Sequence, residues 1–308
     1  MQAEQTILKI SIGMTILIAC SGILFGIITG SFSIAFDGVY SLADASMSTL
    51  ALVVARLIAI DADPSRGKGK LRARFSLGFW HLEPIVLGLN GILLMSVAVY
   101  ALINAIISIL SGGYVLEFNY AILYAAITLV ACLTMAIVVR KKNTTIRSEF
   151  LALDATAWIM SAGITAALLI AFIAGFFVED TTFAWIAPYI DPAVLALVSV
   201  AIIPMPIGTV RQALSDILLL TPEPLRARID DVATDVVKEQ AFLSHRAYVA
   251  RIGRLMQVEL YFIVPAGMPA RTIEEWDQLR DDIGARIGSE GPNRWLTIAF
   301  TADSEWAE

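Results

Sequence analysis

The sequence has few charged residues, few cysteines and few histidines. Charged residues make up 16% of its 308 positions and hydrophobic residues 57%, which is too apolar a composition for a soluble protein of this length. The two cysteines, Cys20 and Cys132, both lie in long apolar runs, where neither a disulfide framework nor a cysteine-rich metal site is expected. The formal net charge of -6 argues against nucleic acid as a partner, because phosphate binding needs a basic surface.

Long apolar segments dominate the first two thirds of the chain. Six of them are long enough to cross a bilayer of about 30 Å as helices. We place them at residues 7–30, 33–59, 79–110, 119–139, 150–177 and 191–210. The first run is longer than the core of a signal peptide and follows no basic region, so no cleavable signal is expected. The sequence therefore predicts an α-helical integral membrane protein.

Basic residues are concentrated in two of the connections between these segments. Residues 66–74 and 140–147 are rich in Lys and Arg, whereas residues 111–117 and 178–185 contain neither. Positive charge marks the cytoplasmic side and contacts anionic lipid. Both termini are therefore predicted to be cytoplasmic.

A more polar segment follows the last apolar run. Residues 211–308 hold half of the Lys and Arg and more than half of the Asp and Glu in under a third of the length. We therefore divide the chain into a membrane domain, 1–210, and a soluble acidic domain, 211–308. Within the second domain the apolar periodicity alternates between that of helices and that of strands. The segments are a helix over 225–236, strands over 248–252 and 256–264, a helix over 276–287 and a strand over 295–301. This order predicts a small ferredoxin-like α/β module, whose limited core favours dimerisation.

Acidic residues inside the apolar runs are the strongest functional signal. Asp37 and Asp44 belong to one predicted helix, and their separation of about two turns places both carboxylates on one helix face. An ionised carboxylate in hydrocarbon costs several kcal/mol unless it is paired, protonated or bound to a cation. We expect an ion to bind at this face. For Asp37, and for Asp154 in the fifth segment, a hydrogen-bonding role between helices is the alternative.

The arrangement resembles the cation diffusion facilitators, six-helix metal/proton antiporters with a cytoplasmic α/β domain. The residues that carry the resemblance are Ser33 to Asp44, Gly78 with Glu83, Leu153 to Ala155 and Asp191 to Ala193. One divergent branch, usually labelled as predicted cobalt/zinc/cadmium transporters, is similar to this chain at further positions. These are Tyr40 to Asp44, Trp80 to Pro84 and Asp154 to Trp158.

The resemblance implies a metal site between the second and fifth helices, with changed ligands. Zinc members supply four ligands there, and the corresponding positions are Tyr40, Asp44, Ala157 and Ser161. Only Asp44 is an ordinary zinc ligand. An oxygen-rich site can be built from Asp44, Asp37, Asp154, Tyr40, Ser161 and water. Oxygen ligands suit manganese or magnesium better than zinc or cadmium.

Three further polar residues bear on a metal pathway. Glu83 stands where the third segment leaves the cytoplasm, and either an entry role for the ion or interfacial packing fits this place. Its neighbour His81 is two residues away and so does not share its helix face. His245 is the only histidine of residues 211–308, which argues against a histidine-based metal site in the soluble domain.

These observations predict a secondary transporter, and not an enzyme, that exports divalent metal cations from the cytosol in exchange for protons. The expected partners are the cation, protons, membrane lipid and a second copy of the chain, in a bacterial inner (plasma) membrane. No tightly bound cofactor is expected, because the metal is the transported substrate. Two alternatives remain: a transport-inactive sensor or assembly protein on the same fold, and a transporter of a non-metal substrate.

Overall fold

The computed structural model describes residues 2–61, 78–114, 116–146, 149–253, 255–291 and 293–307. The basic segment 66–74 and Arg147, on which the predicted orientation partly depends, lie outside the described residues. Packing divides the chain into two units, Met1–Thr49 with Asn90–Gly208 and Leu50–Leu89 with Thr209–Glu308. The domain boundary at residue 210 stays a prediction.

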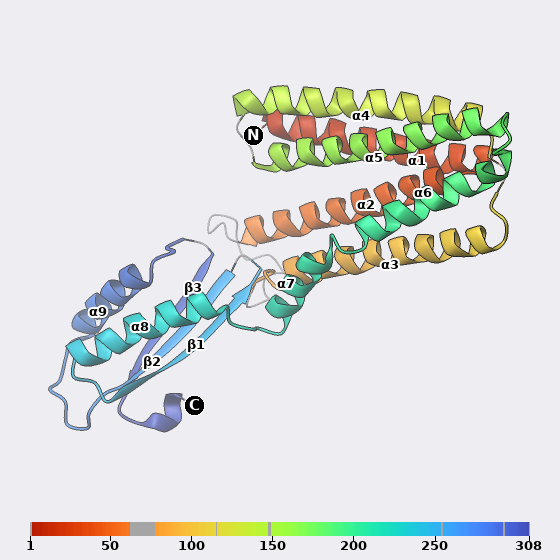
Figure 1. Cartoon of the computed structure of the whole chain (residues 1–308). Helices are drawn as coiled ribbons and strands as arrows, with labels where there is room; N and C mark the ends of the chain where they lie inside the picture. The colour runs from red at the N-terminus through yellow and green to blue at the C-terminus, as the bar shows by residue number, and fades with distance from the viewer. Residues whose placement is uncertain are drawn as a thin grey trace. The chain divides into compact units, whose positions relative to one another are not determined.

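Long helices form the first part of the chain (Figure 1). They are α1 (Gln2–Thr29), α2 (Phe32–Asp61), α3 (Leu82–Leu110), α4 (Phe118–Ile146), α5 (Glu149–Glu179), α6 (Ala187–Ile202) and α7 (Ile207–Ile217). Among the described residues, six helical spans are long and apolar enough to cross a membrane, which confirms the predicted number. Large apolar side chains such as Ile27 and Leu110 are exposed on their outer faces, as lipid contact requires.

The sixth span contains a break that the sequence analysis did not predict. It runs as α6, then a turn over residues 203–206, then α7. Pro204 and Pro206 stand in this turn. Proline lacks the backbone N–H of a helical hydrogen bond and disfavours helical geometry in the residue before it. The two prolines therefore account for the break.

In the first unit, α1 packs against α4 and α5, which are close neighbours along their length (Figure 1). Two glycines let α1 and α2 approach closely. A Cβ atom on Gly38 would lie 2.6 Å from the backbone oxygen of Ala19, and one on Gly26 would lie 2.5 Å from the backbone nitrogen of Ala35. Contacts that short do not occur between real side chains and backbone, so both positions require glycine at this separation of the helices.

The C-terminal part forms the predicted small α/β module. Its elements are α8 (Glu223–Glu239), β1 (Ser244–Ile252), β2 (Leu255–Ile263), α9 (Ile273–Ile287) and β3 (Arg294–Thr301). The sheet order is β1-β2-β3, with β1 antiparallel and β3 parallel to β2. The order helix, strand, strand, helix, strand confirms the predicted fold class, and the parallel pair follows from α9 as the crossover between β2 and β3.

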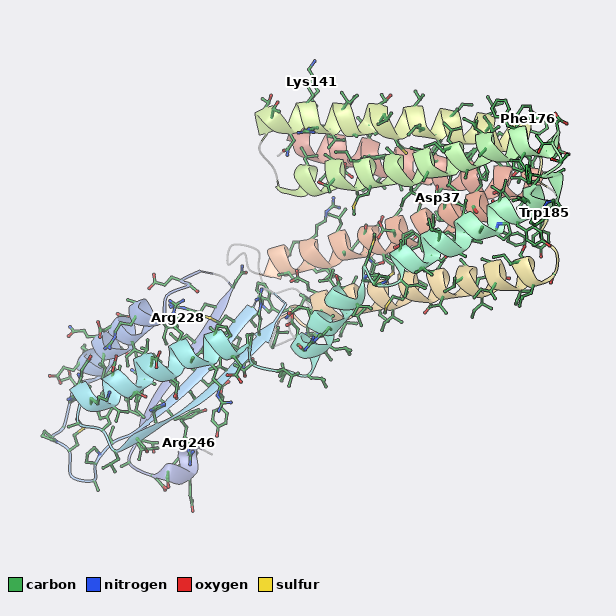
Figure 2. All side chains as sticks on the ribbon, viewed as in Figure 1. Asp37, Lys141, Phe176, Trp185, Arg228 and Arg246 are labelled. Carbon is green, nitrogen blue, oxygen red and sulfur yellow. The ribbon has the colours of Figure 1, made fainter. Side chains whose placement is uncertain are left out.

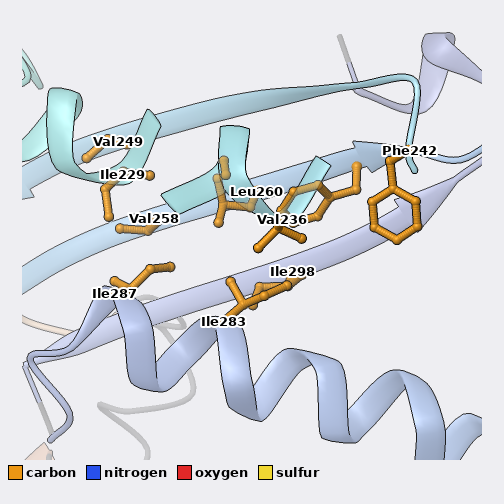
Figure 3. Close-up of a cluster of buried hydrophobic side chains, with 11 residues drawn as sticks. Ile229, Val236, Phe242, Val249, Val258, Leu260, Ile283, Ile287 and Ile298 are labelled. Carbon is orange, nitrogen blue, oxygen red and sulfur yellow. The ribbon is translucent and has the colours of Figure 1, made fainter. Parts of the chain in front are cut away.

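The core of this module lies between its sheet and its two helices (Figure 3). Val258, Leu260 and Phe262 on β2 are fully buried, as are Ile229 on α8 and Ile283 on α9. The alternation along β2 and the helical spacing on α8 and α9 direct these side chains to one layer. The Thr272 and Glu275 side chains form a capping box that begins α9.

Candidate cation site

A cavity in the first unit lies at the position where the sequence predicts a site between the second and fifth helices. It has a volume of about 330 Å³. Six predicted or family-related positions line it: Asp37, Tyr40 and Asp44 on α2, and Asp154, Ala157 and Ser161 on α5. Figure 2 labels Asp37 on α2. All three membrane aspartates of the predicted site thus border the same space.

Two other helices complete the walls of the cavity. Helix α1 contributes Ser11, Thr15 and apolar neighbours, and α6 contributes apolar residues including Leu195 and Ile202. No functional role for α1 is predictable from the sequence, because a lone serine or threonine in an apolar helix gives no functional signal. The polar residues of the lining therefore come from α1, α2 and α5, whereas α6 contributes apolar side chains.

Asp154 is held by residues on two helices. Ser11 Oγ donates a hydrogen bond to Asp154 Oδ1 over 2.8 Å, and the indole Nε1 of Trp158 donates to Ser11 Oγ over 2.7 Å. Ser11 and Trp158 are both buried. The other carboxylate oxygen, Oδ2, is buried and has no hydrogen-bond partner among the described residues. A buried acceptor without a partner is costly and requires an explanation.

Asp44 is linked to a third helix. The side chain of Asn90, on α3, is close enough to the Asp44 carboxylate to interact with it. The amide oxygen of Asn90 is itself buried and unpartnered in the described part of the chain. Asp44 is the most exposed of the three aspartates that line the cavity, since Asp37 and Asp154 are half-buried.

Ser161 occupies the position of a family ligand, and it contacts a thiol. Its Oγ lies 3.6 Å from the Sγ of Cys132 on α4, and Cys132 is fully buried. Its backbone oxygen accepts a hydrogen bond from Thr165 Oγ1 at 2.9 Å. The Ser161 hydroxyl therefore lies between the cavity and the buried thiol.

The structure brings the aspartates to one cavity but does not gather them around one point. Within residues 2–61, 78–114 and the described ranges that follow, no three His, Cys, Asp or Glu side chains are close enough to hold a metal ion together. Glu83 does not line the cavity and belongs to the second unit, where its Oε2 would lie 3.0 Å from a Cβ atom on Gly253. The ligand set named from the sequence stays a prediction.

Comparison with known families identifies the family to which the chain belongs. The model of the cation efflux transmembrane domain matches residues 8–218. The chain belongs to the cation efflux family. This confirms the resemblance to the cation diffusion facilitators and makes the protein an integral membrane cation transporter. Members of the cation efflux family transport divalent cations and are not enzymes. A comparison with curated proteins finds no match.

Proposed function

We propose that this cation efflux protein exports a divalent metal cation from the cytosol in exchange for protons, through the cavity between α2 and α5. One observation carries the proposal: Asp37, Asp44 and Asp154 line the same cavity of about 330 Å³. An ionisable residue inside a membrane is by default a candidate for an ion or proton pathway.

The lining chemistry favours a hard cation. The polar groups on the cavity wall are carboxylates, the Tyr40 phenol and the hydroxyls of Ser11, Thr15 and Ser161. Oxygen donors prefer manganese or magnesium, whereas zinc and cadmium are bound better by imidazole or thiolate. Mn²⁺ is therefore the first ion to test, with Mg²⁺ second.

The same carboxylates supply the coupling to protons. A charged carboxylate in a low-dielectric cavity is costly unless it holds a proton or faces a cation. A site that releases protons when the cation binds, and takes them up when it leaves, exchanges one for the other as the cavity opens to alternate sides. The proposal also includes three properties that rest on the sequence. The basic connections indicate cytoplasmic termini, the family resemblance and the small core of the α/β module indicate a homodimer, and the expected location is a bacterial plasma membrane.

Transport by purified protein in proteoliposomes tests the proposal. Uptake of Mn²⁺, Mg²⁺, Zn²⁺, Co²⁺ and Cd²⁺ is compared with and without a pH gradient, while an internal dye reports pH. We expect Mn²⁺ uptake that an outward proton gradient accelerates, accompanied by proton exit. Failure to transport any of the five ions, by protein that is correctly inserted, would instead support the transport-inactive alternative or a non-metal substrate.

A further inference from the structure

The direction of the hydrogen bonds around Asp154 is fixed by the chemistry of the donors. The indole nitrogen of Trp158 carries a proton and accepts no hydrogen bond. Ser11 Oγ, 2.7 Å away, must therefore accept from it. The Ser11 hydroxyl proton is then directed to Asp154 Oδ1, 2.8 Å away. The order Trp158 to Ser11 to Asp154 therefore holds whenever Asp154 is ionised, which is the form that binds a cation.

This order leaves the two oxygens of Asp154 in different states. Oδ1 accepts from Ser11, whereas Oδ2 is buried and has no partner among the described residues. Asp154 is itself on the wall of the cavity, as are Ser11 and Trp158. A buried carboxylate oxygen without a donor is costly, and a cation bound at Asp154 would supply the missing partner.

We propose that Ser11 and Trp158 are positioning residues that hold Asp154 so that it meets a cation through Oδ2 alone. The inference rests on the proposed function, because it assigns an orientation to one carboxylate of that same site. It makes α1 a part of the cation site, although α1 provides no charged ligand. Asp154 then binds the cation through one oxygen and not through two.

The effect of the two residues is measured as the affinity of the purified, full-length protein for Mn²⁺. Ser11→Ala removes the donor to Oδ1 and frees the carboxylate to rotate. We expect the Kd for Mn²⁺ to rise about tenfold, the low end of the effect of a hydrogen bond to a charged group. Trp158→Phe keeps an aromatic ring but removes the indole N–H, so that the Ser11 hydroxyl can rotate away from Asp154. We expect a smaller rise, about threefold, since the Ser11 hydroxyl is still present.

Matched controls separate positioning from general damage. Trp185→Phe makes the same chemical change at an indole that is 67% exposed. Ser96→Ala removes a membrane-helix hydroxyl that donates only to the backbone oxygen of Ile92, on its own helix. Both controls should leave the Kd unchanged. In transport assays Ser11→Ala should raise the KM for Mn²⁺ and leave the maximal rate within about twofold, because uniform binding and not turnover is weakened.

A double-mutant cycle gives the decisive comparison. If Ser11 acts through Asp154, then Ser11→Ala should cause no further loss of affinity in an Asp154→Ala background. Additive losses, or an unchanged Kd in both Ser11→Ala and Trp158→Phe, would overturn the inference. If Asp154→Ala itself binds and transports Mn²⁺ as the parent does, Asp154 is not a ligand of the cation. This result contradicts both the role of Asp154 in the proposed function and the inference. A loss in Asp154→Ala without one in Ser11→Ala contradicts the inference alone.

Discussion

The Asp191 carboxylate on α6 accepts a hydrogen bond from Ser31 Oγ at 2.6 Å, across 160 positions of sequence. Its other oxygen accepts from the backbone N–H of Phe32 at 2.9 Å, the first residue of α2. The first backbone N–H groups of a helix have no partner within it, and they favour negative charge. Asp191 is only 1% exposed, and it caps α2 from another helix.

Removing this cap should destabilise the protein. Asp191→Ala leaves the buried Ser31 hydroxyl and the Phe32 N–H without their acceptor, and we expect a loss of about 3 kcal/mol in the free energy of unfolding. Asp191→Asn keeps one acceptor oxygen and should lose less than half as much. Thermal unfolding of the detergent-solubilised protein measures both. Asp180→Ala, at an exposed position, is the control, and equal stability of all three variants would contradict the assignment.

A close helix contact gives a second test of the packing. Gly38→Ala brings a Cβ atom within 2.6 Å of the Ala19 backbone oxygen, so that α1 and α2 must separate. Overpacking of this kind costs about 1–3 kcal/mol. A Cβ atom on Gly13 of α1 would have no atom of another described segment within 4 Å. Gly13→Ala should therefore be neutral or slightly stabilising, since alanine is the better helix former. Thermal unfolding should rank the two variants in this order, and the reverse ranking would show that the helices are not this close.

The histidine of the α/β module should have no part in metal binding. His245 Nε2 lies 2.8 Å from Asp230 Oδ1, an exposed partner on α8. Exposed pairs of this kind contribute about 1 kcal/mol or less to stability. His245→Ala in the full-length protein should leave the stoichiometry and affinity of Zn²⁺ binding unchanged, as measured by calorimetry. Loss of one tightly bound Zn²⁺ per chain would show a second metal site in this module.

The selectivity of the cavity should change when the family ligands are restored. Ala157 and Ser161 both line the cavity and stand one helical turn apart on α5. Ala157→His together with Ser161→Asp adds an imidazole, which favours zinc over manganese, and a carboxylate, which adds charge compensation for any divalent ion. We expect the double variant to bind Zn²⁺ at least about tenfold more tightly than the parent, with each single variant between them. An unchanged order and strength of metal binding would place the site elsewhere.

Local patterns predicted most of the fold. The six spans follow from apolar length, and the strand and helix periodicities of residues 225–301 follow from side chains that meet one core. The break at Pro204 and Pro206 was missed, although proline carries a local signal, because the apolar run continues through it. The contribution of α1 could not be predicted: the Ser11 partner lies 143 residues away, and only tertiary packing brings the two together. The three aspartates were found because charge inside an apolar helix is rare.

Transport by Asp44→Ala tests the central claim most directly. Parent, Asp44→Ala and the control Asp180→Ala are reconstituted in proteoliposomes at equal density, and Mn²⁺ uptake is followed over a range of concentrations and pH gradients. The account predicts that Asp44→Ala inserts and dimerises as the parent does but has lost Mn²⁺ transport. In the parent, the Asp44 carboxylate holds the cation and exchanges it for protons. Transport by Asp44→Ala at the rate of the parent would contradict it.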